Sequence, residues 1–315
     1  MIEQFKKDVD QGLSSKPKSL PSKYFYDSMG DKLFVEIMNM PEYYLTRAEM
    51  EIFKTQVQTI IDKLDLSKNQ HFELIELGAG DGTKTIELLK ELVGENYKFD
   101  YLPIDISQHA LNGLKVKLKK QLPTLNVSTQ QGDYFEILST LKANQKPKVI
   151  LFLGSNIGNM SDKKASQFIY NLGANLYPGD SLFLGVDLIK PDHVVLPAYN
   201  DSKGITSAFN LNLLHRINCE LEADFDLNNF VHSPEYREEE GIAYSFLTSK
   251  CEQTVSVKSL NKTFEFEANE KIHTEISRKY NDTVLEKIIA NTDFSIEYKL
   301  TDSDGYFADY ILKRN

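Results

Sequence analysis

The residues best suited to chemistry are an acid and three glycines in the segment 72–85, FELIELGAGDGTKT. An apolar run leads to Glu76, and Gly78, Gly80 and Gly82 follow before a helix predicted at 85–92. Strand, glycine turn and helix in this order form the nucleotide-binding corner of doubly wound α/β sheets. Glycines let the main chain turn sharply and let a ligand approach the backbone. The pattern predicts a nucleotide-type ligand here, and a turn that binds nothing is the alternative.

Three further polar residues are candidates for the same ligand. Asp105 ends the second predicted strand, where an acid usually accepts hydrogen bonds from ribose hydroxyls. Asp133 follows the third strand and fits a contact with an adenine amine, and Lys84 at the turn could reach a carboxylate of the ligand. The competing interpretations are a solvated strand end for Asp105, a turn-forming role for Asp133 and a plain surface position for Lys84.

The elements that must position these residues alternate between strand and helix. After the turn, strands are predicted at 101–106, 126–131, 148–154 and 181–189, with a helix at 108–121 that carries leucines at helical spacing. This alternation predicts a mainly parallel sheet. The rhythm breaks at 190–271, which has a helix near 206–221 and a β-rich stretch at 242–266. Two alternating runs at 294–300 and 306–312 then predict a terminal β-hairpin.

The predicted fold class is therefore α/β: a Rossmann-like sheet with a C-terminal β-hairpin, plus a second, mixed α+β domain. Residues 52–189 and 280–315 are assigned to the sheet domain, which binds the cofactor. Residues 1–51 and 190–279 are assigned to a substrate-binding domain, in the simplest arrangement that packs the first segment with the insertion. We expect a small-molecule site in a cleft between the two domains.

Composition excludes several classes of function. The 315 residues carry a formal net charge of −10, which disfavours nucleic acid or an anionic membrane surface as the main partner. No stretch approaches the roughly 20 apolar residues that cross a bilayer. The two cysteines imply no disulfide framework, and the six histidines do not cluster at metal-binding spacing. We expect a cytoplasmic, monomeric protein without a metal that acts on a small molecule.

Four blocks of sequence together carry a family resemblance. The order E-x-G-x-G-x-G at 76–82 resembles the first motif of S-adenosylmethionine (SAM)-dependent methyltransferases, and Thr83 stands where a dinucleotide fingerprint needs glycine. The other blocks are PKSLPSKYFYDSMGDKLFVEIMNMPEYYLTRAEMEIF at 17–53, LGSNIGN at 153–159 and TEISRKY at 274–280. With these blocks, and with PAYNDSKGITSAFN at 197–210, the chain resembles the histidine Nα-methyltransferase family over nearly its whole length. These enzymes form hercynine in ergothioneine biosynthesis.

The resemblance implies a cofactor, a substrate and site residues. SAM would be the cofactor, bound by Glu76, Gly78, Gly80, Lys84, Asp105 and Asp133. In the family an Asn and Tyr residues hold the amino-acid end of the substrate, while a Glu and a Ser read its imidazole. By motif match the catalytic residues are Tyr26 and Asn159, and the substrate-binding residues are Tyr43, Phe34, Gly154, Tyr199, Glu275 and Ser277. Tyr244 is a departure, since it falls near a place where some members carry Met, and it makes the side-chain preference less certain if it faces the pocket.

The function that this resemblance implies is SAM-dependent methylation of the α-amine of L-histidine, up to the trimethyl betaine. One alternative keeps the chemistry and changes the substrate to another aromatic amino acid or a modified histidine. Two alternatives belong to other classes, an NAD-dependent dehydrogenase and a SAM-binding protein without turnover. Thr83 and the terminal hairpin argue against the first, and the intact Tyr26, Asn159 and Tyr199 argue against the second.

Overall fold

The computed structural model describes residues 2–132, 142 and 144–315. The chain divides into two compact units, one of residues 45–189 and 278–315 and the other of residues 1–44 and 190–277. We call them the sheet unit and the insertion unit. The observed boundaries depart from the predicted division at residues 45–51 and 278–279. Residues 45–51 belong to the sheet unit because they start a continuous helix, Leu45–Thr55, that packs against the last strand of the sheet.

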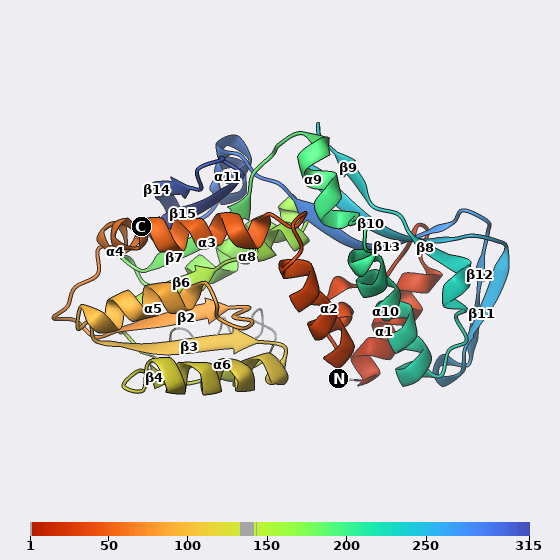
Figure 1. The fold of residues 1–315 in the computed structure, drawn as a ribbon, viewed down its shortest axis with the longest axis horizontal. Coiled ribbons are helices and arrows are strands. Elements are labelled where there is room, and N and C mark those ends of the chain that lie inside the picture. The colour runs from red at the N-terminus through yellow and green to blue at the C-terminus, as the bar shows by residue number, and fades with distance from the viewer. Residues whose placement is uncertain (1, 133–141, 143) are drawn as a thin grey trace. The chain divides into compact units, whose positions relative to one another are not determined.

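The sheet unit is built on one large sheet, which is of eight strands among the described residues (Figure 1). The strands follow the order β14-β15-β7-β6-β2-β3-β4, and β5 also pairs with β3. β2, β3, β6 and β7 run parallel, whereas β15 runs antiparallel to both β7 and β14. The predicted α/β sheet with a C-terminal hairpin is confirmed. The strands are β2 (Phe72–Leu77), β3 (Phe99–Asp105), β4 (Asn126–Val127), β5 (Gln130–Gln131), β6 (Lys148–Phe152), β7 (Ser181–Asp187), β14 (Phe294–Thr301) and β15 (Phe307–Arg314).

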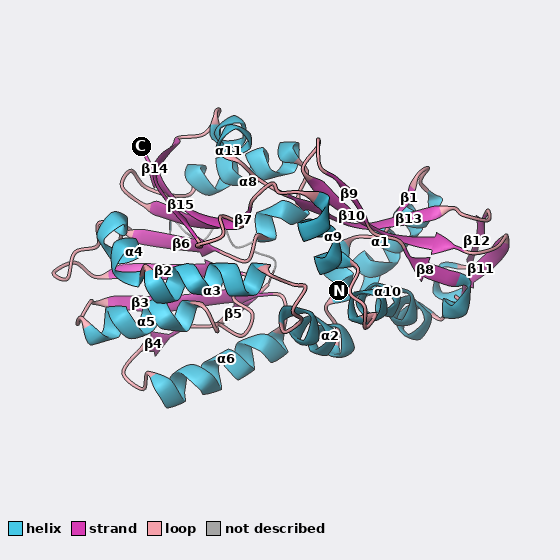
Figure 2. Ribbon diagram, turned by 45° about the horizontal axis from the view of Figure 1, so that its top comes forward, coloured by secondary structure: helices cyan, strands magenta, loops and turns pink. Residues whose placement is uncertain are grey.

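Helices cover both faces of this sheet (Figure 2). Every residue of β2, β6 and β7 is buried, as expected for parallel strands covered on two sides. The predicted helix at 108–121 is confirmed; it is capped by Ser107, and Leu111, Leu114 and Leu118 face the core. The helices are α3 (Leu45–Thr55), α4 (Val57–Leu64), α5 (Thr85–Gly94), α6 (Gln108–Gln121), α8 (Asp162–Ala174), α11 (Asp282–Ile289) and the 3-10 helix η3 (Asn156–Asn159).

The third predicted strand, at 126–131, is wrong in its continuity. The structure has two short pieces, β4 and β5, which pair with β3 in one register on either side of Ser128 and Thr129. These edge residues alternate between exposed and half-buried, so few apolar contacts hold the strand together.

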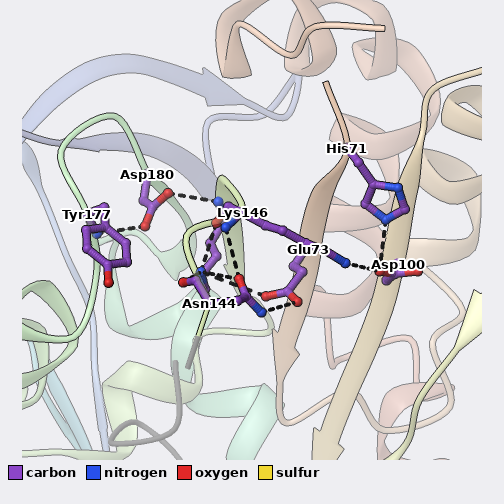
Figure 3. A network of polar contacts seen from close by, with 8 residues as sticks. His71, Glu73, Asp100, Asn144, Lys146, Tyr177 and Asp180 are labelled. Atoms are coloured by element: carbon purple, nitrogen blue, oxygen red, sulfur yellow. Dashed lines mark hydrogen bonds and ion pairs between the residues drawn. The ribbon is translucent and has the colours of Figure 1, made fainter. Parts of the chain in front are cut away.

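A polar network joins neighbouring strands near their amino-terminal ends (Figure 3). The glycine turn lies at the other end of the strands, after β2. Asp100 accepts hydrogen bonds from Lys146 Nζ at 2.9 Å and Asn126 Nδ2 at 2.6 Å, and His71 Nε2 lies 2.8 Å from the same carboxylate. Asp180 accepts from the backbone N–H of Lys148, the first residue of β6. These contacts stabilise the amino-terminal ends of the strands and leave the carboxyl ends for the site.

The insertion unit is a mixed α+β unit with its own core. In its sheet the strand order is β1-β13-β10-β8 with β9 on β10, and β11 and β12 form a separate hairpin. The N-terminal helices and the inserted segment share one apolar cluster, which includes Phe5, Phe25, Phe209 and Phe230. Its helices are α1 (Ile2–Ser14), η1 (Ser22–Phe25), α2 (Ser28–Met38), α9 (Asp192–Tyr199), α10 (Ile205–Leu221), η4 (Leu227–Asn229) and η5 (Lys258–Leu260). Its strands are β1 (Lys18–Ser19), β8 (Phe230–His232), β9 (Glu235–Arg237), β10 (Ile242–Ser249), β11 (Gln253–Val257), β12 (Lys262–Phe266) and β13 (Lys271–Arg278).

No helix within the described part of the chain combines the length and the apolar character that crossing a membrane requires.

Candidate active site

The glycine turn after β2 has the geometry that the sequence predicts. Gly78, Gly80 and Gly82 have φ values of 73°, 53° and 64°, a left-handed backbone that other residues rarely adopt. A Cβ on Gly82 would collide with Leu114 of α6, so glycine at this position allows the turn to pack against α6. A Cβ on Gly80 would meet nothing within 4 Å. Gly80 is therefore the position where a ligand can approach the backbone.

Asp105 lies directly against this turn. Its Oδ2 accepts a hydrogen bond from the backbone N–H of Gly80 at 2.8 Å, and its Oδ1 accepts from the N–H of Ser107 at 2.8 Å. The carboxylate thus couples the end of β3 to the glycine turn.

Glu76 faces the interior beneath the turn. The residue is 3% exposed, and its carboxylate accepts hydrogen bonds from Thr85 Oγ1 at 2.6 Å and from the hydroxyl of Tyr101. Burial raises the pKa of Glu76 to about 7, although the hydrogen bonds from Thr85 and Tyr101 oppose this shift. These contacts tie β2 to β3 and to the start of α5, which gives Glu76 a part in shaping the turn.

Lys84 and Gly154 meet through a third residue, Glu49 of α3. Lys84 Nζ donates to Glu49 Oε2. The N–H of Gly154 lies 2.9 Å and 3.1 Å from the two carboxylate oxygens of the same Glu49. The glutamate therefore holds the residue before α5 and the loop after β6 together. Asp133, the remaining candidate for cofactor binding, lies outside the described residues.

The loop that carries Asn159 is fixed by its backbone. Ser155 has a left-handed φ of 58°, and its Oγ accepts from the N–H of Asp187 at 3.0 Å. A Cβ on Gly158 would lie 2.8 Å from the carbonyl oxygen of Arg278, so only glycine fits there. Asn159 ends η3 with an exposed side chain. A rigid loop thus presents an amide group that can both donate and accept hydrogen bonds.

In the insertion unit, Tyr199 and Ser277 are hydrogen-bonded partners. The hydroxyl of Tyr199, at the end of α9, donates to Ser277 Oγ of β13 at 2.8 Å, and both residues are buried. The carbonyl of Tyr199 lies 2.9 Å from His232 Nε2. Burial lowers the pKa of His232, which keeps this imidazole neutral at physiological pH. His232 was not among the predicted residues, and it anchors the end of α9.

Glu275 shares a strand face with Ser277, as the alternation along β13 predicts. The ring of His273, two residues earlier on that face, lies 5.9 Å from the ring of Tyr244 on β10. Because of this contact, Tyr244 lies on the face that carries Glu275. The Tyr244 hydroxyl also donates to Glu240 at 2.9 Å.

Tyr26 and Phe34 belong to an aromatic cluster with Phe209 of α10. The rings of Tyr26 and Phe34 are 5.5 Å apart in an edge-to-face arrangement, and Phe209 lies 5.8 Å and 5.9 Å from them. The aspartate of the FYD block has a local role, because Asp27 caps α2 by accepting from the N–H groups of Met29 and Gly30. Tyr43, which follows α2, packs half-buried against the core of the same unit.

The structure thus places the predicted residues in two sets, each within one unit. The sheet unit holds a turn suited to a nucleotide-type ligand together with an amide on a rigid loop. The insertion unit holds a hydroxyl pair, a carboxylate and aromatic rings. Within the described residues no group of three His, Cys, Asp or Glu side chains is arranged to bind a metal.

Glu49 is the main site-region residue that sequence reasoning missed. It lies in the quoted TRAE block, at a buried position of α3 between apolar residues. An acid on the apolar face of an amphipathic helix is a signal that could have been read, because buried carboxylates need partners.

The comparisons with known proteins agree with this geometry. The chain matches the family described as "Histidine-specific methyltransferase, SAM-dependent" over residues 5–314. It is 34% identical over 305 residues to the histidine N-alpha-methyltransferase of Mycolicibacterium smegmatis, covering 97% of this chain and 93% of that protein. It is 36% identical over 275 residues to the enzyme of the same name from Mycobacterium tuberculosis, covering 87% and 84%. A solved structure described as a possible exported protein from Bordetella parapertussis aligns over 98% of this chain and 79% of that one, with a TM-score of 0.50 and 12% identity, which supports the fold alone. The chain belongs to the histidine-specific, SAM-dependent methyltransferase family.

Proposed function

We propose that this enzyme transfers methyl groups from SAM to the α-amine of L-histidine, up to the trimethyl betaine hercynine. The observation that carries the proposal is the Tyr199–Ser277 hydroxyl pair on the strand face of Glu275. This arrangement offers an acceptor and a donor to one small ring. A neutral imidazole has one N–H and one bare nitrogen, and it matches that pair of groups.

The residues around the glycine turn fit SAM. Gly80 leaves open space above the backbone, and Asp105 binds the turn at the end of β3, the place where an acid accepts hydrogen bonds from ribose hydroxyls in this class of fold. We propose that Lys84 contacts the carboxylate of the cofactor. We propose that Gly78 lets the cofactor lie close to the protein backbone. Bound SAM supplies an electrophilic methyl group on a sulfonium.

Asn159 and Tyr26 are the proposed catalytic residues. The amine must be neutral and held in line with the methyl group, because an ammonium has no lone pair, and positioning supplies much of the catalysis in such a displacement. The Asn159 amide can accept from the amine and donate to the substrate carboxylate. The Tyr26 hydroxyl would orient the amine and pass its proton towards water between rounds of methylation.

The aromatic cluster suits the product. Repeated methylation builds a quaternary ammonium, and an aromatic face stabilises such a cation by about 0.5–2 kcal/mol. The rings of Tyr26 and Phe34 lie edge to face at 5.5 Å, and we assign them to the methylated amine. Tyr199, Tyr43 and Gly154 complete the proposed substrate set.

Glu275 and Ser277 are the proposed specificity residues. Ser277 Oγ accepts a hydrogen bond from Tyr199, and this contact would direct the O–H of Ser277 towards an imidazole nitrogen. Glu275 would accept from the imidazole N–H. A substrate without that N–H would not form this charge-assisted bond, and the site would discriminate against it.

A second substrate class has one observation in its favour. Tyr244 lies on the same strand face as Glu275. Its aromatic ring is therefore a partner on which the side chain of a larger aromatic amino acid can stack. Another aromatic amino acid or a modified histidine is therefore the alternative substrate of the same site.

We also propose that the protein works as a monomer in the cytoplasm. Both cysteines, Cys219 and Cys251, are unpaired, as expected in a reducing compartment.

Incubation of the purified enzyme with SAM and an equimolar mixture of amino acids, read by mass spectrometry, tests the proposal. We expect histidine to gain one, two and then three methyl groups, with fragmentation placing them on the α-nitrogen. Methylation of another amino acid in preference to histidine would contradict the assigned substrate, and absence of any methylated product would contradict the assigned reaction.

A further inference from the structure

Two carboxylates meet in the interior of the sheet unit. Glu49 of α3 and Asp309 of β15 are both 0% exposed. They meet above Gly185 of β7, where an added Cβ would collide with Glu49 Oε1 and lie 2.8 Å from Asp309 Oδ1. The absent side chain at position 185 therefore creates the space in which the two acids face each other. We call them the Glu49–Asp309 pair.

The two members of the pair have different partners. Glu49 accepts from Lys84 Nζ and from the backbone N–H of Gly154, which suits an ionised carboxylate. Among the described residues, neither oxygen of Asp309 has a conventional donor within reach. Two acids this close cannot both be ionised in a buried site, so they share a proton. Asp309 is the member that lacks donors, and its O–H can donate to Glu49.

The surrounding charges support this assignment. Burial and then the neighbouring Glu49 raise the pKa of Asp309 well above its ordinary value, and Lys84 only partly opposes them. Glu76 of β2 adds a further acid near Lys84 and Glu49, and burial raises its pKa to about 7. On β7, Asp187 is already paired with Lys279 at 2.7 Å.

We propose that Glu49 is a positioning residue for the cofactor site: it holds Lys84 and the Gly154 loop in place, and a proton carried by Asp309 lets it do so. The inference rests on the proposed function, because it assumes that Lys84 contacts the cofactor. The pair does not touch the reacting atoms, and it acts through the two groups that Glu49 binds.

Binding of S-adenosylhomocysteine, measured by calorimetry, tests the role of Glu49. E49Q keeps the shape of the side chain but removes the negative charge that Lys84 contacts. We expect E49Q to weaken binding about tenfold, as for the loss of a hydrogen bond to a charged group. K84M should also weaken it, and the E49Q/K84M double variant should bind no worse than K84M alone. E51Q, on the same helix and half-buried, is the matched control and should bind like the wild type.

A pH series tests the role of Asp309. D309N fixes a donor towards Glu49 that cannot be lost. In the wild type, rising pH removes the shared proton and leaves two facing anions, so affinity should fall on the alkaline side. D309N should lack the part of that fall that the pair causes. Thermal unfolding of each variant shows whether a loss of affinity merely follows a loss of folding.

The outcomes separate this inference from the proposed function. Wild-type protein that binds no S-adenosylhomocysteine overturns both. Wild-type binding with E49Q unchanged, or with E49Q and K84M losses that simply add, overturns the inference alone. An alkaline fall of equal size in the wild type and D309N overturns the assignment of the proton to Asp309.

Discussion

The hydroxyl of Tyr199 donates a 2.8 Å hydrogen bond to Ser277 Oγ, joining the end of α9 to the end of β13. Both residues are buried, with 8% and 6% of their surface exposed. A hydroxyl that accepts such a bond has its own proton aimed elsewhere. The relationship fixes the orientation of a donor on the strand that carries Glu275.

Tyr199→Phe should therefore weaken the use of histidine without affecting the cofactor. The loss of one hydrogen bond, about 0.5–1.5 kcal/mol, should raise KM for histidine by a few-fold to about tenfold. Steady-state kinetics with calorimetry of S-adenosylhomocysteine measure both quantities. In a double-mutant cycle, Tyr199→Phe should add little to Ser277→Ala, because Tyr199 acts through the Ser277 hydroxyl. Fully additive effects would show that the two hydroxyls act independently.

The glycine turn gives a paired prediction. Gly80→Ala and Gly82→Ala both place a side chain on a left-handed backbone, at a cost of about 1 kcal/mol each. Only Gly82→Ala also collides with Leu114, so it should lose more stability in urea unfolding. Gly80→Ala should keep more of its stability and lose cofactor affinity, because its new methyl group lies where the ligand approaches. Equal stability and equal affinity in the two variants would be inconsistent with this geometry.

Asn159→Ala should abolish most turnover while the protein stays folded. The side chain is exposed, so stability should change by no more than about 0.5 kcal/mol. Turnover should fall because the amino-acid end of the substrate loses its anchor and a misplaced amine reacts slowly. Single-turnover rates and thermal unfolding check the two halves. Near-normal turnover would remove Asn159 from the reacting centre.

Tyr26→Phe should be milder than Asn159→Ala and should change the product distribution. The hydroxyl matters most when the amine must be deprotonated and reoriented between rounds of methylation. Mass spectrometry of the mono-, di- and trimethylated products over time should show earlier products accumulating. An unchanged distribution would contradict the assigned role.

Acid stability offers a prediction away from the site. Burial alone would raise the pKa of Asp100, but hydrogen bonds from Lys146, Asn126 and His71 outweigh it and bring the pKa to about 2. A depressed pKa contributes stability above the unfolded value of about 3.9, and that contribution is lost as the pH falls towards 2. Asp100→Asn should thus be less stable than the wild type near neutral pH, and the gap should shrink between about pH 4 and pH 2. Asp304→Asn, at an exposed loop position, should show no such change in urea unfolding.

Local patterns in the sequence predict the sheet unit well, because local contacts decide them. The helix at 108–121 has leucines on one face and a serine cap, and both signals lie within its own residues. The glycine turn and the terminal hairpin are likewise short-range features. The predicted site residues rest on motif matches, and their roles stay predictions until the variants are measured.

Long-range features escape such reasoning. Glu49 and Asp309 come from α3 and the last strand, and the sequence between them says nothing of their meeting above Gly185. The predicted boundary after residue 51 fails for a similar reason, since the packing of α3 on β15 decides which unit its first residues join. Side-chain contacts of this kind depend on the fold as a whole.

Selectivity for histidine over tryptophan tests the central claim most directly. Glu275→Ala removes an ionised partner of the imidazole, at a cost of about 1.5–3 kcal/mol for histidine, while an apolar aromatic amino acid loses little. The ratio of kcat/KM for histidine over tryptophan should fall by roughly one to two orders of magnitude. Glu265→Ala, at an exposed glutamate of β12 in the same unit, is the matched control and should keep the wild-type ratio. A ratio unchanged in Glu275→Ala would contradict the account, because imidazole would then not be read by this carboxylate.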